Sequence, residues 1–244
     1  MRSAWRAELL KLTTVRGLWL SIVLAAVAIP ATSLLVVSTG GLGARDTVTS
    51  GAAAGSLVGL LAYGAWGATF AAGEYAQHTM VVSLATVPRR RVLYTAKLAA
   101  TATAAGAGAV VAAVVALLTV FAVTPRGDHA FGNPAALVGV VLAVAAVAVC
   151  GAAVGMLTRS PSGSIAIVVL ALLLPKAAGG LLGGLQRWVV GASPGTVITQ
   201  IVGGAQLPND QAYPGGAWAA AATMVVAAAA VGVAGFVSFS RRDG

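Results

Sequence analysis

The sequence contains very little charge. Of its 244 residues, only 9% are Asp, Glu, Lys or Arg, against roughly 25% in an ordinary soluble domain. Hydrophobic residues make up 59%, and the mean hydropathy is +0.93. A soluble protein of this size could not keep its surface hydrated with so few charged side chains. The composition therefore excludes a soluble enzyme, a disordered chain and a nucleic-acid-binding domain.

The residues that usually carry out catalysis are also scarce. The chain has one cysteine, Cys150, so no disulfide can form within it, and two histidines, His78 and His129. The zinc-protease, serine-hydrolase and P-loop motifs are absent from the sequence. No acidic residue falls deep within an apolar segment, as a proton relay would require. The sequence therefore predicts a non-catalytic membrane protein with no cofactor or metal of its own.

What the sequence does have is six long apolar segments. A membrane-spanning helix needs about 20 apolar residues to cross ~30 Å of hydrocarbon, and each segment is long enough. Helices satisfy their own backbone hydrogen bonds in lipid. We therefore predict an all-α membrane protein with six transmembrane helices in a single domain over residues 1–244. The expected spans are residues 17–39, 51–73, 98–123, 134–158, 163–182 and 215–238.

The basic residues are unevenly distributed along a chain of net charge +9. If the N-terminus is cytoplasmic, eleven of the 15 Lys and Arg residues fall in inner segments. Only Arg45, Arg126 and Arg187 fall outside, and Lys176 lies within or near the fifth span. The positive-inside rule then predicts a multi-pass protein of the cell membrane with both termini in the cytoplasm.

The first sixteen residues are compatible with an amphipathic helix. Trp5, Leu9 and Leu12 share one face, while Arg2 and Arg6 lie elsewhere on the helical wheel. Such a helix would lie in the inner interface of the membrane and lead into the first span. The alternative interpretation is a segment that only anchors the topology.

The long inner loop between the second and third spans contains a second helix-compatible stretch, residues 74–85. Glu74 would suit the start of this helix if a break at Gly73 made it a new one. Val87-Pro88 stops the helix, and three arginines follow. A short helix along the inner surface could be gripped by a cytoplasmic partner. The alternative is an interfacial helix with a basic cluster that only fixes the topology.

The stretch from Pro175 to Pro214 is too apolar for a free loop and too interrupted by Gly and Pro to span the membrane. Val197–Val202 predicts a short re-entrant or surface helix at the outer mouth. Lys176 lies about two-thirds along the fifth span, where an ammonium group should meet water or a partner rather than lipid. It is our candidate for a residue of a transport path. The alternative is a structured loop with no role in transport.

Three stretches together resemble the membrane subunits of type-2 ABC transporters, which are permeases with six spans. They are the N-terminal RAELLKLTTVRGLWL, the loop GEYAQHTMVVSLATVPRRRVLYTAKL, and LLLPKAAGGLLGGL with the semi-apolar segment that follows it. The first is similar to the interfacial helix of that family, the second to its cytoplasmic coupling loop, and the third to its fifth span and outer re-entrant helices. The resemblance covers most of the chain.

The resemblance implies a mechanism. Two permease units, identical copies or paralogues, would form a dimer that exports a lipid, a drug or a peptide antibiotic. Two cytoplasmic ABC ATPase subunits would bind beneath it and supply ATP and Mg²⁺ chemistry. By the matching loop, the residues expected at the ATPase-coupling interface are Glu74, Tyr75, His78, Thr79, Arg89 and Arg90.

Two other functions fit the composition. A channel or secondary transporter would need ionisable groups inside its spans, and only Lys176 is a candidate. A membrane scaffold without transport activity would need none. Membrane lipids are expected partners under every interpretation, and nucleic acid under none.

Overall fold

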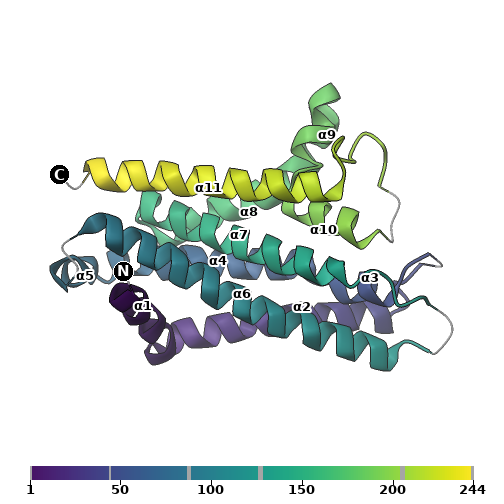
Figure 1. Ribbon diagram of the computed structural model, residues 1–244, viewed down its shortest axis with the longest axis horizontal. Helices are drawn as coiled ribbons and strands as arrows, with labels where there is room; N and C mark the ends of the chain where they lie inside the picture. The colour runs from purple at the N-terminus through teal and green to yellow at the C-terminus, as the bar shows by residue number, and fades with distance from the viewer. Residues whose placement is uncertain (1, 44, 87–88, 126–128, 204–206, 243–244) are drawn as a thin grey trace.

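The chain forms a bundle of long helices that run along one axis (Figure 1). The computed structural model describes residues 2–43, 45–86, 89–125, 129–203 and 207–242. These described residues form helices, turns and loops and contain no β-strand. The long helices are α2 (Arg16–Ser38), α4 (Ser56–Ala76), α6 (Arg90–Val123), α7 (Ala135–Thr158), α8 (Pro161–Ala177) and α11 (Ala217–Arg242).

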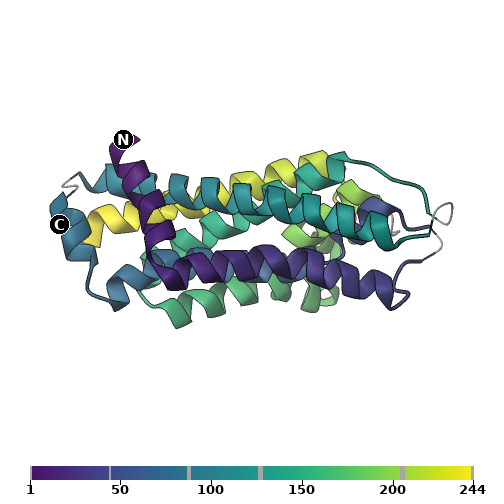
Figure 2. The ribbon, with the colours of Figure 1, turned by 90° about the horizontal axis from the view of Figure 1, so that it is seen from below.

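Shorter helices lie at the two ends of this bundle. Helix α1 (Arg2–Thr14) crosses one end at a steep angle to the long helices, and α5 (Met80–Thr86) lies at the same end, as do both termini (Figure 2). The opposite end carries α3 (Val48–Ala53), α9 (Gln186–Val189) and α10 (Pro194–Val202). We refer to these as the α1 end and the α10 end.

Five of the described helical segments are long and apolar enough to cross a membrane. They are Arg16–Ser38, Val48–Ala76, Arg90–Val123, Ala135–Thr158 and Ala217–Ser240, whereas α8 is a shorter apolar helix. Large apolar side chains remain exposed along the bundle, among them Leu24 and Leu118, as expected of a surface that faces lipid. These features indicate a multi-pass membrane protein.

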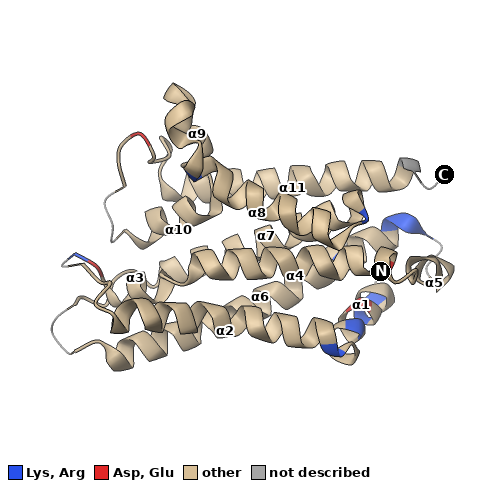
Figure 3. Cartoon of the chain, turned by 180° about the vertical axis from the view of Figure 1, so that it is seen from behind, with Lys and Arg blue, Asp and Glu red and all other residues tan. Residues whose placement is uncertain are grey.

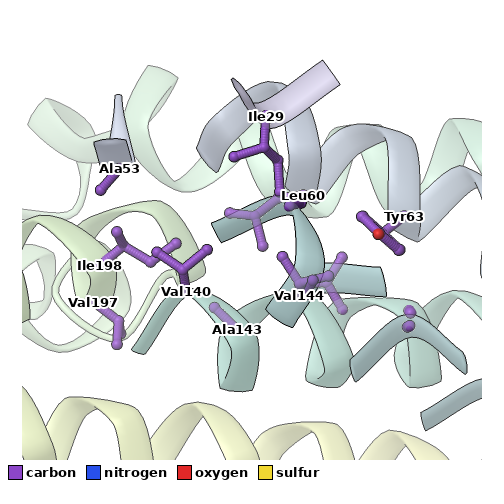
Figure 4. Close-up of a cluster of buried hydrophobic side chains, with 14 of the residues drawn as sticks. Ile29, Ala53, Leu60, Tyr63, Val140, Ala143, Val144, Val197 and Ile198 are labelled. Carbon is purple, nitrogen blue, oxygen red and sulfur yellow. The ribbon is translucent and has the colours of Figure 1, made fainter. Parts of the chain in front are cut away.

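Helices α4 and α7 form the centre of the bundle because glycine lets their backbones touch. A Cβ atom on Gly67 would lie only 2.1 Å from the carbonyl oxygen of Ala148, and one on Gly151 would lie 2.3 Å from that of Gly64. Small residues at such crossings allow the close packing that drives helix association in lipid. The surrounding core, part of which appears in Figure 4, includes Leu60 and Val144.

The predicted second span is interrupted in the structure. Instead of one helix over residues 51–73, α3 and α4 meet at residues 54 and 55. The buried Ser33 hydroxyl of α2 donates a hydrogen bond to the carbonyl of Ala52 (2.8 Å) and accepts one from the N–H of Gly55 (3.0 Å). These bonds satisfy backbone groups that the interruption leaves without helical partners.

Two other predicted boundaries differ from the structure. Helix α6 begins at Arg90 rather than at residue 98, and its 34 residues extend about 50 Å, well beyond the hydrocarbon thickness. Helix α8 ends at Ala177 rather than at Leu182, after Pro175, and two 3-10 turns follow (Gly179–Leu181 and Gly183–Leu185). The short helix expected around residues 197–202 is present as α10, and Arg126 and Val87-Pro88 lie outside the described residues.

Candidate functional site

Four charged side chains, three of them largely buried, form a cluster at the α1 end. The Lys97 ammonium donates hydrogen bonds to Glu8 Oε2 (2.7 Å) and Glu74 Oε1 (2.8 Å), and the Lys11 ammonium donates to Glu8 Oε1 (2.6 Å) and Glu74 Oε1 (2.8 Å). Lys97 is fully buried, and the side chains of Glu8 and Glu74 are 3% and 12% exposed. The ring of Phe70 lies 4.5 Å from the Lys97 nitrogen and adds a cation–π contact. Two ammonium and two carboxylate groups thus neutralise one another.

This charge cluster joins four helices. Glu8 and Lys11 come from α1, Glu74 from α4 and Lys97 from α6. The hydroxyl of Ser83 on α5 connects the fourth helix, since it accepts from Lys11 Nζ (3.1 Å) and donates to Glu74 Oε2 (3.3 Å). Displacing α1, α4 or α6 would break ion pairs of the cluster, which is costly in a low-dielectric site, and displacing α5 would break the two hydrogen bonds of Ser83.

Glu74 does not begin a new helix, contrary to the expectation from sequence. Helix α4 continues through Gly73 to Ala76, so Glu74 lies in its last turn. A carboxylate there is close to the negative end of the helix dipole, which is unfavourable. The two lysine ammonium groups overcome this penalty. The chain instead turns at His78, whose φ of 56° is left-handed, before α5 begins.

The charge cluster raises the pKa of the Lys11 ammonium group. Burial alone would lower the pKa of Lys11, but hydrogen bonds to Glu74 and Glu8, together with their negative charges, outweigh that effect and raise the pKa above 10.5. Lys11 therefore stays charged throughout the physiological range.

Glu8 and Lys97 were missed as site residues by the sequence analysis. Lys97 was assigned to an inner loop because α6 was expected to begin one residue later. The buried face of α1 is Ala4, Glu8 and Leu12, not the Trp5, Leu9 and Leu12 face, and Trp5 and Leu9 are half-buried. The spacing of Ala4, Glu8 and Leu12 was the available signal, because an acid between two apolar residues at intervals of four shares their face.

The other predicted interface residues fall into two groups. His78, Thr79 and Arg89 are exposed, while Tyr75 and Arg90 are half-buried. The ring of Tyr75 lies 5.3 Å from the guanidinium carbon of Arg159, at the end of α7. The structure therefore places the six residues at one end of the bundle but divides them between packing contacts and a free surface.

The free surface around α5 combines polar and apolar groups. Met80 and Ser83 of this helix are buried, whereas Val81 and Val82 are 73% and 63% exposed. A pocket of about 330 Å³ opens beside it, and its lining includes Lys11, Glu74 and Ser83. Most of the Lys and Arg residues gather at this end of the molecule, as Figure 3 shows.

The α1 end is also tied to the last helix. The hydroxyl of Tyr94 in α6 donates a 2.6 Å hydrogen bond to the carbonyl of Gly232 in α11. The ring of Tyr94 contacts Phe236 and Phe239 of the same helix. Ser83 thus links α5 to α1 and α4, Lys97 links these helices to α6, and Tyr94 links α6 to α11.

The α10 end has a different polar site. A cavity of about 310 Å³ lies between α2, α3, α4, α8 and α10, and both Lys176 and Asp46 line it. Lys176 is exposed in the last turn of α8, closer to the helix end than its predicted place two-thirds along a longer span. Its sequence-predicted role in a transport path stays a prediction.

Within the described ranges, no group of three or more His, Cys, Asp or Glu side chains is placed to hold a metal ion. Comparisons with known protein families, with curated proteins and with solved structures found no match.

Proposed function

We propose that the chain is the membrane subunit of a type-2 ABC transporter, with its ATP hydrolysis on a separate cytoplasmic subunit. In this proposal all six long helices cross the cell membrane and the α1 end faces the cytoplasm. A second copy or a paralogue completes the export path. The substrate would be a lipid, a drug or a peptide antibiotic.

One observation carries this proposal: α5 lies at the end of the bundle, presents Val81 and Val82 outward, and is joined to α1, α4 and α6 through the charge cluster. A helix that docks on a motor subunit needs an exposed face for the motor and a connection to the spans. Helix α5 has an exposed face, and the hydrogen bonds of Ser83 connect it to α1 and α4. The positive-inside rule gives independent support for a cytoplasmic α1 end, because most Lys and Arg residues lie there.

The first test is co-purification from the native membrane. A C-terminal tag, extraction in mild detergent and mass spectrometry should recover a stoichiometric ATPase subunit, together with ATP hydrolysis in the eluate. Recovery of the chain alone, with no ATP-dependent activity, would overturn the proposal. The channel and scaffold interpretations would then replace it.

The second test addresses the docking surface directly. Val81→Asp places a charge on the exposed face of α5 without touching the charge cluster, and should reduce the recovered ATPase by about tenfold or more, as for a residue central to an interface. The control is Thr13→Asp, at an exposed position of α1 on the same end of the bundle. Equal ATPase recovery with both variants would show that α5 is not the docking helix.

A further inference from the structure

The cavity at the α10 end has a charge composition that the proposed function does not explain. Its lining includes Lys176, from the end of α8, and Asp46, from the loop before α3. The lining also includes apolar side chains, among them Leu57 and Leu172, and hydroxyl groups. A cavity with one cation, one anion and an apolar wall is complementary to an amphiphile rather than to a simple ion.

Lys176 makes no ion pair or hydrogen bond with another residue in the part of the chain that the structure describes. It is exposed in the last turn of α8 and lines the cavity. In the proposed function α8 crosses the membrane, where an ammonium group needs a polar partner or access to water. The cavity provides the space in which such a partner can approach.

The carboxylate of Asp46 is also available to bind a ligand. One carboxylate oxygen, Oδ2, accepts a 2.8 Å hydrogen bond from the N–H of Gly43, and no described Lys or Arg forms an ion pair with this carboxylate. The hydroxyls of Ser193 and Thr199 also line the cavity and donate to the carbonyls of Val190 and Gly195. Because their hydrogens are engaged, these hydroxyls offer acceptors, which suit an amine donor.

We propose that this cavity binds the headgroup of a zwitterionic amphiphile of the phosphoethanolamine-lipid class. The phosphate would lie against Lys176, the amine against Asp46 and the acceptor hydroxyls, and the start of the acyl chains along Leu57 and Leu172. The volume of about 310 Å³ is at the lower end of ligand pockets, so it holds a headgroup while the rest of each chain stays in the bilayer. A purely anionic lipid would meet repulsion from Asp46, and a free zwitterion would leave the apolar wall uncovered.

The proposal is independent of the ATPase, because it concerns binding to this chain alone. Native mass spectrometry of the purified full chain in detergent would follow titrations of phosphatidylethanolamine, phosphatidylglycerol and soluble phosphoethanolamine. We expect phosphatidylethanolamine to bind the most tightly of the three. Equal binding of phosphatidylglycerol would overturn the zwitterionic assignment, and equal binding of soluble phosphoethanolamine would overturn the amphiphile assignment.

Charge-removing variants test the two proposed contacts separately. Lys176→Gln should weaken phosphatidylethanolamine binding by about tenfold, the effect of one lost charge-assisted hydrogen bond. Asp46→Asn should weaken phosphatidylethanolamine but not phosphatidylglycerol. The matched control is Arg187→Gln, which removes an exposed charge at the same end, outside the cavity. Unchanged binding in both cavity variants would overturn the proposal, and the lipid preference of the unaltered chain tests it even if a variant fails to fold.

Discussion

The two ends of the bundle differ in how they accommodate a lysine. At the α1 end, Lys97 is fully buried, and both carboxylates that contact it come from the same chain. At the α10 end, Lys176 is exposed on the wall of a cavity and has no ion-pair partner among the described residues. The same residue type thus completes an internal structure at one end and leaves a charge available at the other.

The difference follows from how closely polar groups of neighbouring helices approach each lysine. Helices α1, α4, α5 and α6 bring their polar groups within 3.3 Å of one another, and these contacts replace the water that a charge would otherwise need. At the α10 end the helices stop short or are interrupted, and a cavity remains between them. An internally satisfied charge stabilises a connection, whereas an unsatisfied one can recognise a ligand.

Among the changes that test this comparison, substitution of Lys97 should have the largest effect on the free energy of unfolding. Lys97→Met leaves Glu8 and Glu74 buried with only Lys11 between them, and should lower the free energy of unfolding by about 3–5 kcal/mol. Thermal unfolding of the purified protein in detergent measures it. Adding Glu8→Gln to Lys97→Met leaves one positive charge, on Lys11, and one negative charge, on Glu74. The double variant should therefore be less destabilised than the sum of the two single variants. Simple additivity would mean that the charges do not interact as a cluster.

The pairing of Lys97 also shows where sequence reasoning reached its limit. Apolar segments long enough to span a membrane can be read locally, and so can the short helix after Pro194. The charge cluster cannot, because Lys97 and Glu8 are 89 residues apart and Glu74 is 23 residues from Lys97. Only the packing of α1 against α6 brings them together.

The interrupted second span was unpredictable for a similar reason. The sequence at residues 54 and 55 contains no proline, and the break depends on Ser33 of another helix. By contrast, the gathering of the six predicted interface residues at one end follows from their closeness in sequence. The sequence did not show which of these residues, such as Glu74, would point into the charge cluster.

A smaller loss of stability is expected at alkaline pH, where Lys11 loses its proton. Since its pKa is raised in the folded protein, the stabilisation from its ion pairs is complete below about pH 10.5 and is lost as the pH rises through the folded pKa. The thermal midpoint should therefore fall above pH 10.5. Lys11→Arg keeps its charge in this range and should fall less steeply with pH. Identical profiles for the two proteins would mean that other groups cause the alkaline loss.

The smallest effect on stability is expected at the α10 end, from substitution of Lys176. Lys176→Met removes an exposed ammonium that has no ion-pair partner among the described residues, so the free energy of unfolding should change by less than about 0.5 kcal/mol. The measurement is the same thermal unfolding used for Lys97→Met, in lipid-free detergent, because a bound lipid would itself add stability. A loss comparable to that of Lys97→Met would show that Lys176 is a structural residue. The lysines at the two ends would then differ only in exposure, since both would stabilise the fold.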